Sequence, residues 1–459
     1  MDEERIVLLT DTVTELAEQK NWQALRELLC DEAPQDIAIL MEDLDDRRMP
    51  LVFRLLPKEL AAETFVEMPV DQQEALIAGF SDAELKDVIS ELYVDDAADI
   101  VEEMPANLVK RILASADADT RKAINEILKY PEDSAGSIMT TEYVRLDRSL
   151  TVDDAFKRIR RVGVDKETVY TCYVTESDKK LIGLVTVKDL LLADGETLIG
   201  DVMMTDIIYA YTTDDRESAV GEMAKYDFIA LPVVDGEKRL VGIITIDDAI
   251  DVIQDENTED IEKMAAITPS DKPYLRTGVF SIWLHRIPWL LLLMVSATFT
   301  GAIITSFEES LAAVAALTAF IPMLMDTGGN AGSQTSVTII RGLALGEISP
   351  RDIFKVICKE ACVSLLCGIT LAAANYVKIL LIDNLLLGSG VTSTVALVVC
   401  LTLAVTVVIA KLVGCILPIL AKMIGADPAV MASPFITTIV DALSLLVYFG
   451  IAKALIAAL

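Results

Sequence analysis

The pattern of apolar and polar positions divides the chain near residue 280. Before that point, apolar residues recur at helical spacing or alternate in short runs, as in half-buried helices and strands. After it come long, mostly apolar runs, and runs of about 20 such residues are typical of membrane-spanning helices. The five runs are residues 287–307, 311–340, 361–382, 391–421 and 429–457. The sequence therefore predicts five membrane helices behind a soluble region.

Two polar interruptions lie inside these runs. Asp441 is the only charged residue between positions 428 and 452, although a carboxylate at the centre of a bilayer costs about 2.5–3.5 kcal/mol on insertion scales. Acids in such places usually face a pathway, so we expect a functional role for Asp441. The second interruption is MDTGGNAGSQTS, residues 325–336. Its glycines permit either a close helix approach or a local break.

Basic residues in the connections give the orientation. The connection between the second and third runs, residues 341–360, holds four basic residues, whereas the connection before the second run holds Glu308 and Glu309. Short basic connections stay on the cytoplasmic side. We therefore expect the N-terminal region in the cytoplasm and the C-terminus outside an inner or plasma membrane. Among the lysines inside the runs, Lys378 is expected to reach the membrane surface, and the pattern indicates no role for Lys411.

Residues 5–130 have the periodicity of helices. Apolar residues recur at helical spacing, and Pro57, Pro69 and Pro105 divide the region into short helices. The segments LLPKELAAETFVEMP and SELYVDDAADIVEEMP resemble each other. Such repetition predicts a small, all-helical superhelix.

An internal repeat occupies residues 138–257. The triplet Gly183, Thr186 and Asp189 recurs 59 positions later and ends at Asp248. Each copy has the pattern of strand, turn, strand and helix, preceded by an amphipathic helix. The repeat resembles a tandem pair of CBS domains, which have an α+β fold.

The CBS resemblance implies a candidate nucleotide site. Many CBS pairs bind an adenine nucleotide such as ATP in the cleft between the two copies. The matching residues here are Lys188, Asp189, Phe228 and Pro232. Asp189 would hold the ribose, with Phe228 and Pro232 beside the base. An empty, purely structural cleft is an equal alternative.

The charge is distributed unevenly along the chain. The sequence is 53% hydrophobic and yet has a net charge of −32. Residues 281–459 contain nine acidic and nine basic residues, so the first 280 residues carry the whole negative charge. This argues against nucleic acid and anionic lipid as partners of that region. It favours small cations, because concentrated carboxylates repel one another until a cation neutralises them.

The most acidic segment follows the repeat directly. Residues 247–266 contain eight acidic residues and one lysine. On a helix, the acids at positions 248, 251, 255, 259 and 262 would form one stripe. Asp95 and Asp99, four residues apart, would also share a helix face, for which a solvated surface is an equal alternative.

The candidate ligands are those of a hard cation. Mg2+ takes oxygen ligands, keeps several waters and uses one or two carboxylates. An Asp in a membrane helix, doubled by a two-fold dimer, matches that demand. The only histidine is His285, so a zinc site of His and Cys is not indicated.

Taken together, these features resemble the MgtE family of magnesium channels and transporters. The motifs that carry the resemblance are LLPKELAAE, YDFIALPVVD, DDAIDVI with TEDIEK, TGGNAGSQ, and GADPAVMASPFITTIVD. The resemblance implies a homodimeric multidomain membrane protein that is not an enzyme. Its expected domains are an acidic helical domain (1–132), two CBS domains (133–200 and 201–257), a connecting plug helix (258–280) and a pore domain of five helices (281–459).

The resemblance also implies two kinds of Mg2+ site. In the pore, Asp441 would hold hydrated Mg2+ near a polar turn at Gly329 and Asn330, with a backbone oxygen from Thr437. Regulatory Mg2+ would join the cytoplasmic acids and close the pore. The matching regulatory residues are Glu63, Asp95, Asp99, Glu217, Asp227, Asp248, Asp251, Glu256, Glu259 and Asp260. Asp326, before the polar turn, either adds a binding site or is protonated.

Other functions stay open at this point. A transporter of another divalent cation, such as Co2+, Mn2+ or Ni2+, would use the same oxygen ligands, which discriminate poorly among these ions. An intramembrane aspartyl protease needs two carboxylates at one site, for which Asp326 and Asp441 are a conceivable pair, but the sequence has no G-x-G-D stretch. A CBS-regulated anion carrier would require Arg or helix N-termini rather than Asp in its pathway. A Mg2+ sensor would have the same acids and conduct nothing.

Overall fold

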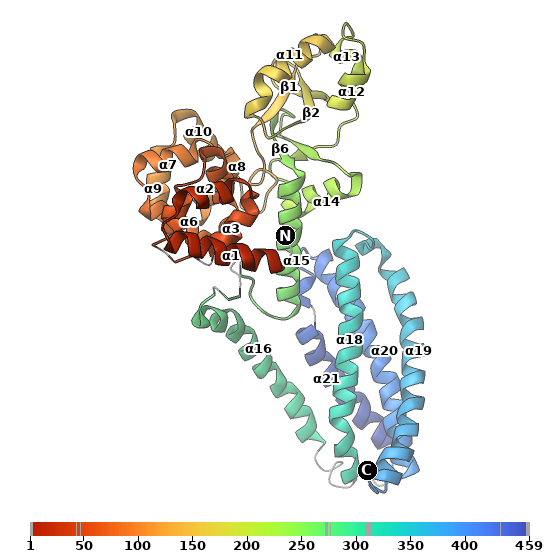
Figure 1. Cartoon of the computed structure of the whole chain (residues 1–459). Helices are drawn as coiled ribbons and strands as arrows, with labels where there is room; N and C mark the ends of the chain where they lie inside the picture. Colours follow the sequence, from red (N-terminus) through yellow and green to blue (C-terminus); the bar gives the residue numbers. More distant parts are fainter. Residues whose placement is uncertain are drawn as a thin grey trace. The chain divides into compact units, whose positions relative to one another are not determined.

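The computed structural model describes residues 3–42, 44–45, 47–270, 274–275, 277–307, 314–431 and 433–455. They fall into two compact units, Met1–Ile253 and Gln254–Leu459 (Figure 1). The first unit holds short helices followed by two small sheets, and the second is built of long helices. Some predicted features lie outside the described residues: Glu308, Glu309, positions 311–313 of the second apolar run, and positions 432, 456 and 457 of the fifth.

The described part of the first 130 residues forms short helices around one apolar core. The helices are α1 (Glu3–Glu18), α2 (Trp22–Cys30), α3 (Pro34–Glu42), α4 (Met49–Phe53), α5 (Lys58–Val66), α6 (Val70–Gly79), α7 (Asp82–Ile89), α8 (Val94–Glu103), α9 (Ala106–Ser115) and α10 (Ala118–Ile127). Pro57, Pro69 and Pro105 each cap the start of a helix, where the missing N–H is not needed. The predicted helical character is confirmed, and the superhelical arrangement stays a prediction.

Two three-stranded sheets with the same topology follow. In each sheet the first strand pairs parallel with the second, and the second pairs antiparallel with the third. The strands are β1 (Tyr143–Leu146), β2 (Thr168–Thr175), β3 (Leu181–Thr186), β4 (Ala210–Tyr211), β5 (Ala230–Val234) and β6 (Leu240–Thr245). The helices beside them are α11 (Val152–Val162), η1 (Gly163–Asp165), α12 (Val187–Leu192), α13 (Ile199–Val202) and α14 (Arg216–Tyr226). The predicted repeat of strand, strand and helix is therefore present.

The repeated G-x-x-T-x-x-D motif has a local structural cause. The Thr186 hydroxyl oxygen accepts a hydrogen bond from the Asp189 backbone N–H at 3.2 Å. The Asp189 carboxylate accepts one from the Thr186 backbone N–H at 3.1 Å, which completes a capping box at the start of α12. Thr245 likewise donates a hydrogen bond to Asp248 at the start of α15 (Ile246–Met264). The motif therefore begins a helix directly after a strand in both copies.

Helix α15 is the acidic helix predicted after the repeat, but its limits differ from the expected connecting helix over 258–280. It starts directly after β6 and ends at Met264. The chain turns where Ala266 has a φ of +55° and the Ile267 N–H donates to the Glu262 carbonyl oxygen at 2.9 Å. The next helix among the described residues begins at Val279. The helical connection is therefore shorter than expected and belongs partly to the repeat.

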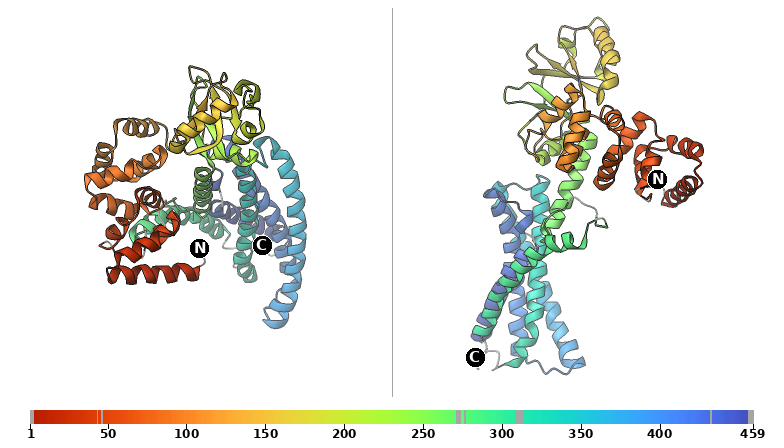
Figure 2. Two further views of the ribbon diagram at one scale, coloured as in Figure 1. Left: turned by 45° about the horizontal axis from the view of Figure 1, so that its top comes forward. Right: turned by 90° about the vertical axis from the view of Figure 1, so that its left-hand side faces the viewer.

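The second unit is a bundle of long helices. Its elements are α16 (Val279–Ser306), η2 (Ala315–Phe320), α18 (Ile321–Ala344), η3 (Pro350–Asp352), α19 (Ile353–Lys378), the π-helical η4 (Ile379–Leu386), α20 (Ser393–Met423), η5 (Ala429–Met431) and α21 (Ser433–Leu455). Helix α20 packs against α18, α19 and α21, and Figure 2 shows these four helices side by side. Helix α16 packs against α21.

Among the described residues, four helices are long and apolar enough to cross a membrane. They are Val279–Ser306, Pro350–Leu386, Ser393–Met423 and Ala429–Leu455. Helix α18, which contains most of the second predicted run, has 24 residues, and its polar stretch makes it less apolar. The count of five spans therefore stays a prediction.

Helix α18 is unbroken through its glycines. The alternative of a local break, and the polar turn expected at Gly329 and Asn330, are therefore wrong. The glycines instead allow close packing: a Cβ on Gly332 would lie 3.1 Å from the backbone oxygen of Ala410, and one on Gly414 would collide with the backbone oxygen of Gly332. Small residues thus bring the backbones of α18 and α20 together.

Candidate cation sites

Carboxylates gather around α8 in the first unit. Asp248, at the start of α15, lies close enough to repel both Asp95 and Asp99 on α8. Asp95 is 6% exposed, and its Oδ1 has no hydrogen-bond partner among the described residues. A buried acceptor without a donor is costly, and a cation would satisfy it. The structure thus brings together three of the predicted regulatory residues.

Burial and mutual repulsion make these carboxyls weak acids. Burial, followed by the charge of Asp248, raises the pKa of Asp95 well above its usual range. Burial and the charge of Asp96 raise the pKa of Asp99 to about 7. Burial also raises the pKa of Asp248 to about 6, against hydrogen bonds from Thr245 that lower it. A bound divalent cation would compete with protons at these groups near neutral pH.

Two members of this cluster were not predicted. Burial and the charge of Asp248 raise the pKa of Asp96 to about 7 and that of Glu167 to about 8. Asp96 is a sequence neighbour of Asp95, so the run of acidic residues in the sequence could have indicated that it belongs to the cluster. Glu167 precedes β2 in the first repeat, and nothing in its local pattern marks it.

Three other predicted regulatory residues lie on α5 and α14. Glu63 is exposed on α5, and its charge acts on Tyr93, the N-cap of α8. Glu217 lies in the first turn of α14, and Asp227 forms its C-terminal cap with a φ of +56°. Ten residues of helix separate the backbones of Glu217 and Asp227 by about 15 Å. One chain therefore cannot use both as direct ligands of the same ion.

The second half of α15 contacts the loop before α21. The Lys263 ammonium lies 2.6 Å from the Glu259 carboxylate and 2.8 Å from the Asp427 carboxylate. Burial, and then the charge of Asp427, raise the pKa of Asp260. Asp427 was not predicted as a site residue, although it lies in the motif GADPAVM. The remaining predicted residues, Asp251 and Glu256, lie on the same helix.

In the membrane unit, Asp441 lies on α21 where this helix meets the glycines of α18. A Cβ on Gly329 would lie 3.0 Å from Cγ2 of Thr437, so the two helices are in direct contact there. Oδ1 of Asp441 is buried and has no hydrogen-bond partner among the described residues. Asp326 of α18 lies close enough for its charge to act on Asp441. The structure thus brings Asp441, Thr437 and Gly329 to the same helix crossing.

One face of α18 is polar and exposed. Asp326, Asn330 and Gln334 follow one another at four-residue spacing, and all three are exposed. The opposite face, with Gly332 and Thr335, is buried. Lipid offers no hydrogen bonds, so a charged, polar stripe on a membrane helix has to face water or another chain.

Lys378 and Lys411 are both paired. Lys378 lies 3.1 Å from Asp383 and 5.6 Å from the centre of the Phe320 ring. That Lys378 reaches the membrane surface stays a prediction. Lys411, for which the sequence indicated no role, is buried and donates a hydrogen bond to Thr335 at 3.1 Å.

Within the described part of one chain, the acids do not enclose a metal ion. Among the described residues, no three or more His, Cys, Asp or Glu side chains are grouped so that they could hold a metal ion. Any site would be completed by water, backbone oxygens or a second chain. Mg2+ fits such a site, because it keeps several waters and takes few carboxylates.

The four residues predicted to bind a nucleotide are spread over both repeats. Lys188 is exposed on α12, and the Asp189 carboxylate is engaged in the capping box with Thr186. Phe228 stacks on Tyr226 with ring centres 5.5 Å apart, and Pro232 is buried in β5. The capping role explains why Asp189 recurs without requiring a ligand.

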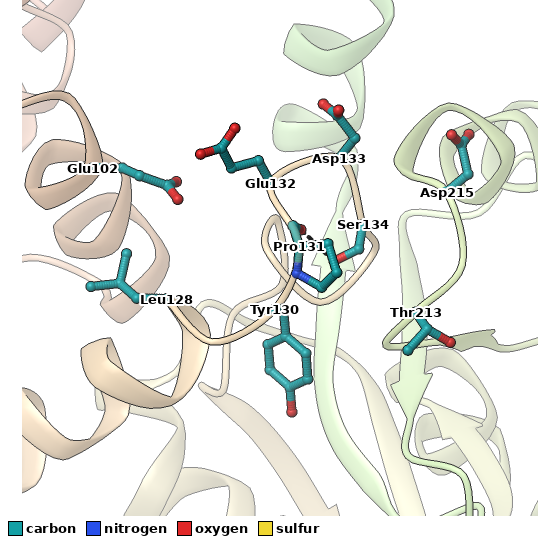
Figure 3. A pocket seen from close by; sticks show the side chains of 9 residues that line it. All are labelled: Glu102, Leu128, Tyr130, Pro131, Glu132, Asp133, Ser134, Thr213 and Asp215. Carbon is teal, nitrogen blue, oxygen red and sulfur yellow. Dashed lines mark hydrogen bonds between the residues drawn. The ribbon is translucent and has the colours of Figure 1, made fainter.

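An open acidic pocket of about 600 Å³ lies elsewhere in the first unit (Figure 3). It is lined by Glu102, Leu128, Tyr130, Pro131, Glu132, Asp133, Ser134, Thr213 and Asp215. Burial and the charge of Glu132 raise the pKa of Glu102. None of the predicted site residues lines this pocket.

Sequence models of three families match the chain. The MgtE model, described as a divalent cation transporter, matches residues 321–451, the MgtE intracellular N domain matches 32–133, and the CBS domain matches 135–196 and 199–255. The magnesium transporter MgtE of Thermus thermophilus is 36% identical, and the match covers 98% of this chain and 99% of that protein. This chain belongs to the MgtE family of magnesium transporters. The MgtE of Bacillus subtilis is 34% identical over 94% of this chain and 96% of its own.

Solved structures support the fold of the first unit. The cytosolic domain of the Mg2+ channel MgtE in complex with ATP matches with a TM-score of 0.51 and 35% identity, over 53% of this chain and 99% of that domain. The soluble part of a magnesium transporter matches with a TM-score of 0.51 and 28% identity, over 55% of this chain and 99% of its own. The predicted family and the CBS pair are confirmed. With its apolar helices, this MgtE family member is a multi-pass membrane protein, and its full-length relatives are named as transporters.

Proposed function

We propose that two copies of this MgtE family member form a Mg2+-selective pore for Mg2+ uptake, and that cytoplasmic Mg2+ closes the pore. One observation carries the proposal: Oδ1 of Asp441, buried and without a hydrogen-bond partner among the described residues, lies beside the exposed polar face of α18. Relatives that are named magnesium transporters support the choice of ion.

The pore chemistry follows from the needs of hydrated Mg2+. Two Asp441 carboxylates, one from each copy, neutralise the ion without removing all of its water. Asn330 and Thr437 supply dipoles that hold the remaining water. Because α18 is an unbroken helix, Gly329 serves close packing against Thr437 rather than offering a free backbone oxygen.

Asp326 adds a second carboxylate to the same path. It is exposed one helical turn before Asn330 and is the charged group that acts on Asp441. Two like charges at one site attract a divalent cation more strongly than either does alone. In this assignment Asp326 is a second binding position along the pore.

Closure by cytoplasmic Mg2+ follows from repulsion among the acids. Without bound cations, the carboxylates repel one another. They are the acids of α8, Glu167, Asp248 and the other acids of α15. This repulsion favours an arrangement in which these acids lie further apart. Mg2+ bound at these places favours the packed arrangement in which the pore is closed. A ligand shifts such an equilibrium only by its different affinity for the two states, and several weak sites together make the response steep.

The remaining assignments extend this proposal. The N-terminal region and the connection between α18 and α19 lie in the cytoplasm, and the C-terminus lies outside. The cleft between the CBS domains is a site for ATP, which is supported by the ATP complex of the similar cytosolic domain. Transport of Co2+, Mn2+ or Ni2+ with the same gating is the alternative.

The deciding experiment is Mg2+ flux into liposomes that contain the purified protein. Flux is expected at low internal Mg2+ and is expected to stop as internal Mg2+ rises. Absence of any flux would refute transport, and flux that ignores internal Mg2+ would refute gating. The same liposomes with Co2+, Mn2+ or Ni2+ outside test the alternative directly.

A further inference from the structure

A buried ion pair lies behind the polar face of α18. The Lys411 ammonium on α20 donates a hydrogen bond to Oγ1 of Thr335 on α18 at 3.1 Å, and the Thr335 hydroxyl donates one to Oε2 of Glu360 on α19 at 3.1 Å. The charged atoms of Lys411 and Glu360 are 4.0 Å apart, and their side chains are 9% and 15% exposed. One chain of polar contacts therefore joins three helices inside the apolar unit.

Loss of any one of these three side chains destabilises the arrangement. Two opposite charges in an apolar interior offset each other, but removal of either leaves the other buried and uncompensated. Thr335 is well suited to the middle position, because a hydroxyl accepts one hydrogen bond and donates another. The contacts are directional, so they restrain the rotation of α18 between its two neighbours.

The position of Thr335 links the ion pair to the pore face. Thr335 follows Gln334, the last member of the exposed polar stripe, and lies one turn after Gly332. On α20, Lys411 lies one turn before Gly414, which meets Gly332 at the closest approach of the two helices. Contact between two glycines sets the distance between helices but holds their rotation weakly. The bond from Lys411 to Thr335 supplies that missing restraint.

We propose that Lys411, Thr335 and Glu360 form an ionic tie that positions the polar face of α18 along the ion path. The inference rests on the proposed function of that face. Lys411 and Glu360 are positioning residues: they act on the transported ion through the orientation of α18. The tie sets how well Asn330 and Asp326 present their oxygens to hydrated Mg2+.

The sharpest test compares two substitutions at one position in liposome flux, normalised to the amount of folded protein. Thr335→Val keeps the volume of the side chain and removes both hydrogen bonds, whereas Thr335→Ser keeps the hydroxyl. We expect Thr335→Val to raise the Mg2+ concentration for half-maximal flux by about fivefold or more, and Thr335→Ser to stay within about twofold of the unaltered protein. Unchanged half-maximal concentration in Thr335→Val would overturn the tie.

A charge-removal series tests the ion pair itself. Lys411→Met and Glu360→Gln are each expected to lower flux per folded protein by about tenfold or more, because each leaves one buried charge alone. The double variant is expected to recover most of the flux. Lys422→Met, which removes an exposed lysine from the same helix, is the matched control and should change nothing.

Other outcomes separate the explanations. A double variant no better than the single ones would overturn the tie. A lower yield of folded protein with an unchanged half-maximal Mg2+ concentration would identify a merely structural contact and would also overturn it. If the single variants do not fold, the two Thr335 variants decide. Absence of flux in the unaltered protein would instead overturn the proposed function.

Discussion

The Lys263 ammonium lies 2.8 Å from Oδ2 of Asp427 and so joins the acidic helix α15 to the loop before α21. The same ammonium lies 2.6 Å from Glu259. Burial lowers the pKa of Lys263, but the hydrogen bonds to Asp427 and Glu259 raise it overall. The Lys263 ammonium thus lies among acids that the resemblance assigns to regulatory Mg2+. It offsets their negative charge without any ion from solution.

Removal of this side-chain cation should make the contact depend on Mg2+. In Lys263→Met, Glu259 and Asp427 repel each other until a divalent cation binds. We expect flux at low internal Mg2+ to rise about two- to fivefold, because each partly exposed ion pair contributes at most about 1 kcal/mol. Liposome flux at several internal Mg2+ concentrations measures this, with Lys355→Met at an exposed ion pair as control. Lower flux at low Mg2+ would contradict the assignment.

The pore assignment predicts a complete loss of flux in Asp441→Asn. The amide keeps the shape of the side chain and removes the charge that neutralises the ion, so Mg2+ flux should fall to the level of empty liposomes while the protein stays folded. Glu347→Gln is the matched control, because Glu347 is exposed in the connection after α18. Undiminished flux in Asp441→Asn would refute the pore at this position.

Features that depend on neighbours in the chain were predictable from the sequence. The G-x-x-T-x-x-D repeat predicted strand and helix correctly, because Thr186 and Asp189 cap a helix three residues apart. The prolines gave the starts of short helices for the same local reason. Asp441 was recognisable because a charge in an apolar run has no local explanation.

Features that depend on distant segments were not predictable. Whether the glycines of α18 break the helix or pack closely depends on the backbone of α20, which lies about 80 positions later in the chain. Lys411 had no role until its partners Thr335 and Glu360 were seen on two other helices. Glu167 and Asp427 likewise join acids from other elements, so their partners cannot be identified from neighbouring positions, although Asp427 lies in the motif GADPAVM.

The exposed carboxylate of Asp326 predicts a smaller effect than that of Asp441. Asp326→Asn removes one of two neighbouring charges, and we expect the Mg2+ concentration for half-maximal flux to rise about two- to fivefold with flux retained, since exposed charges interact by about 1 kcal/mol or less. Flux measured against external Mg2+ provides the test. An unchanged half-maximal Mg2+ concentration would leave Asp441 as the single carboxylate that binds the ion along the path. Complete loss of flux would make the two acids equivalent.

The acid cluster around α8 makes stability depend on pH. Burial raises the pKa of Asp96 and Asp99 to about 7 and that of Glu167 to about 8. The unfolded carboxyls lose their protons near pH 4. Between about pH 4 and 8 the folded protein therefore binds more protons than the unfolded one, so its stability without Mg2+ falls as the pH rises through that range.

Mg2+ should reverse this loss of stability. We expect the melting temperature of the first unit, followed in the full chain in detergent without Mg2+, to be roughly 5–10 °C lower at pH 8 than at pH 5.5. Saturating Mg2+ should raise the melting temperature more at pH 8 than at pH 5.5, because fewer protons compete with Mg2+ for these carboxylates at pH 8. Asp248→Asn should weaken both effects, because Asp248 acts on Asp95, Asp96 and Glu167. Its counterpart Asp189→Asn weakens a similar helix cap outside the cluster and should leave the response to Mg2+ unchanged. An equal loss of the Mg2+ response in both variants would attribute it to capping instead of the cluster.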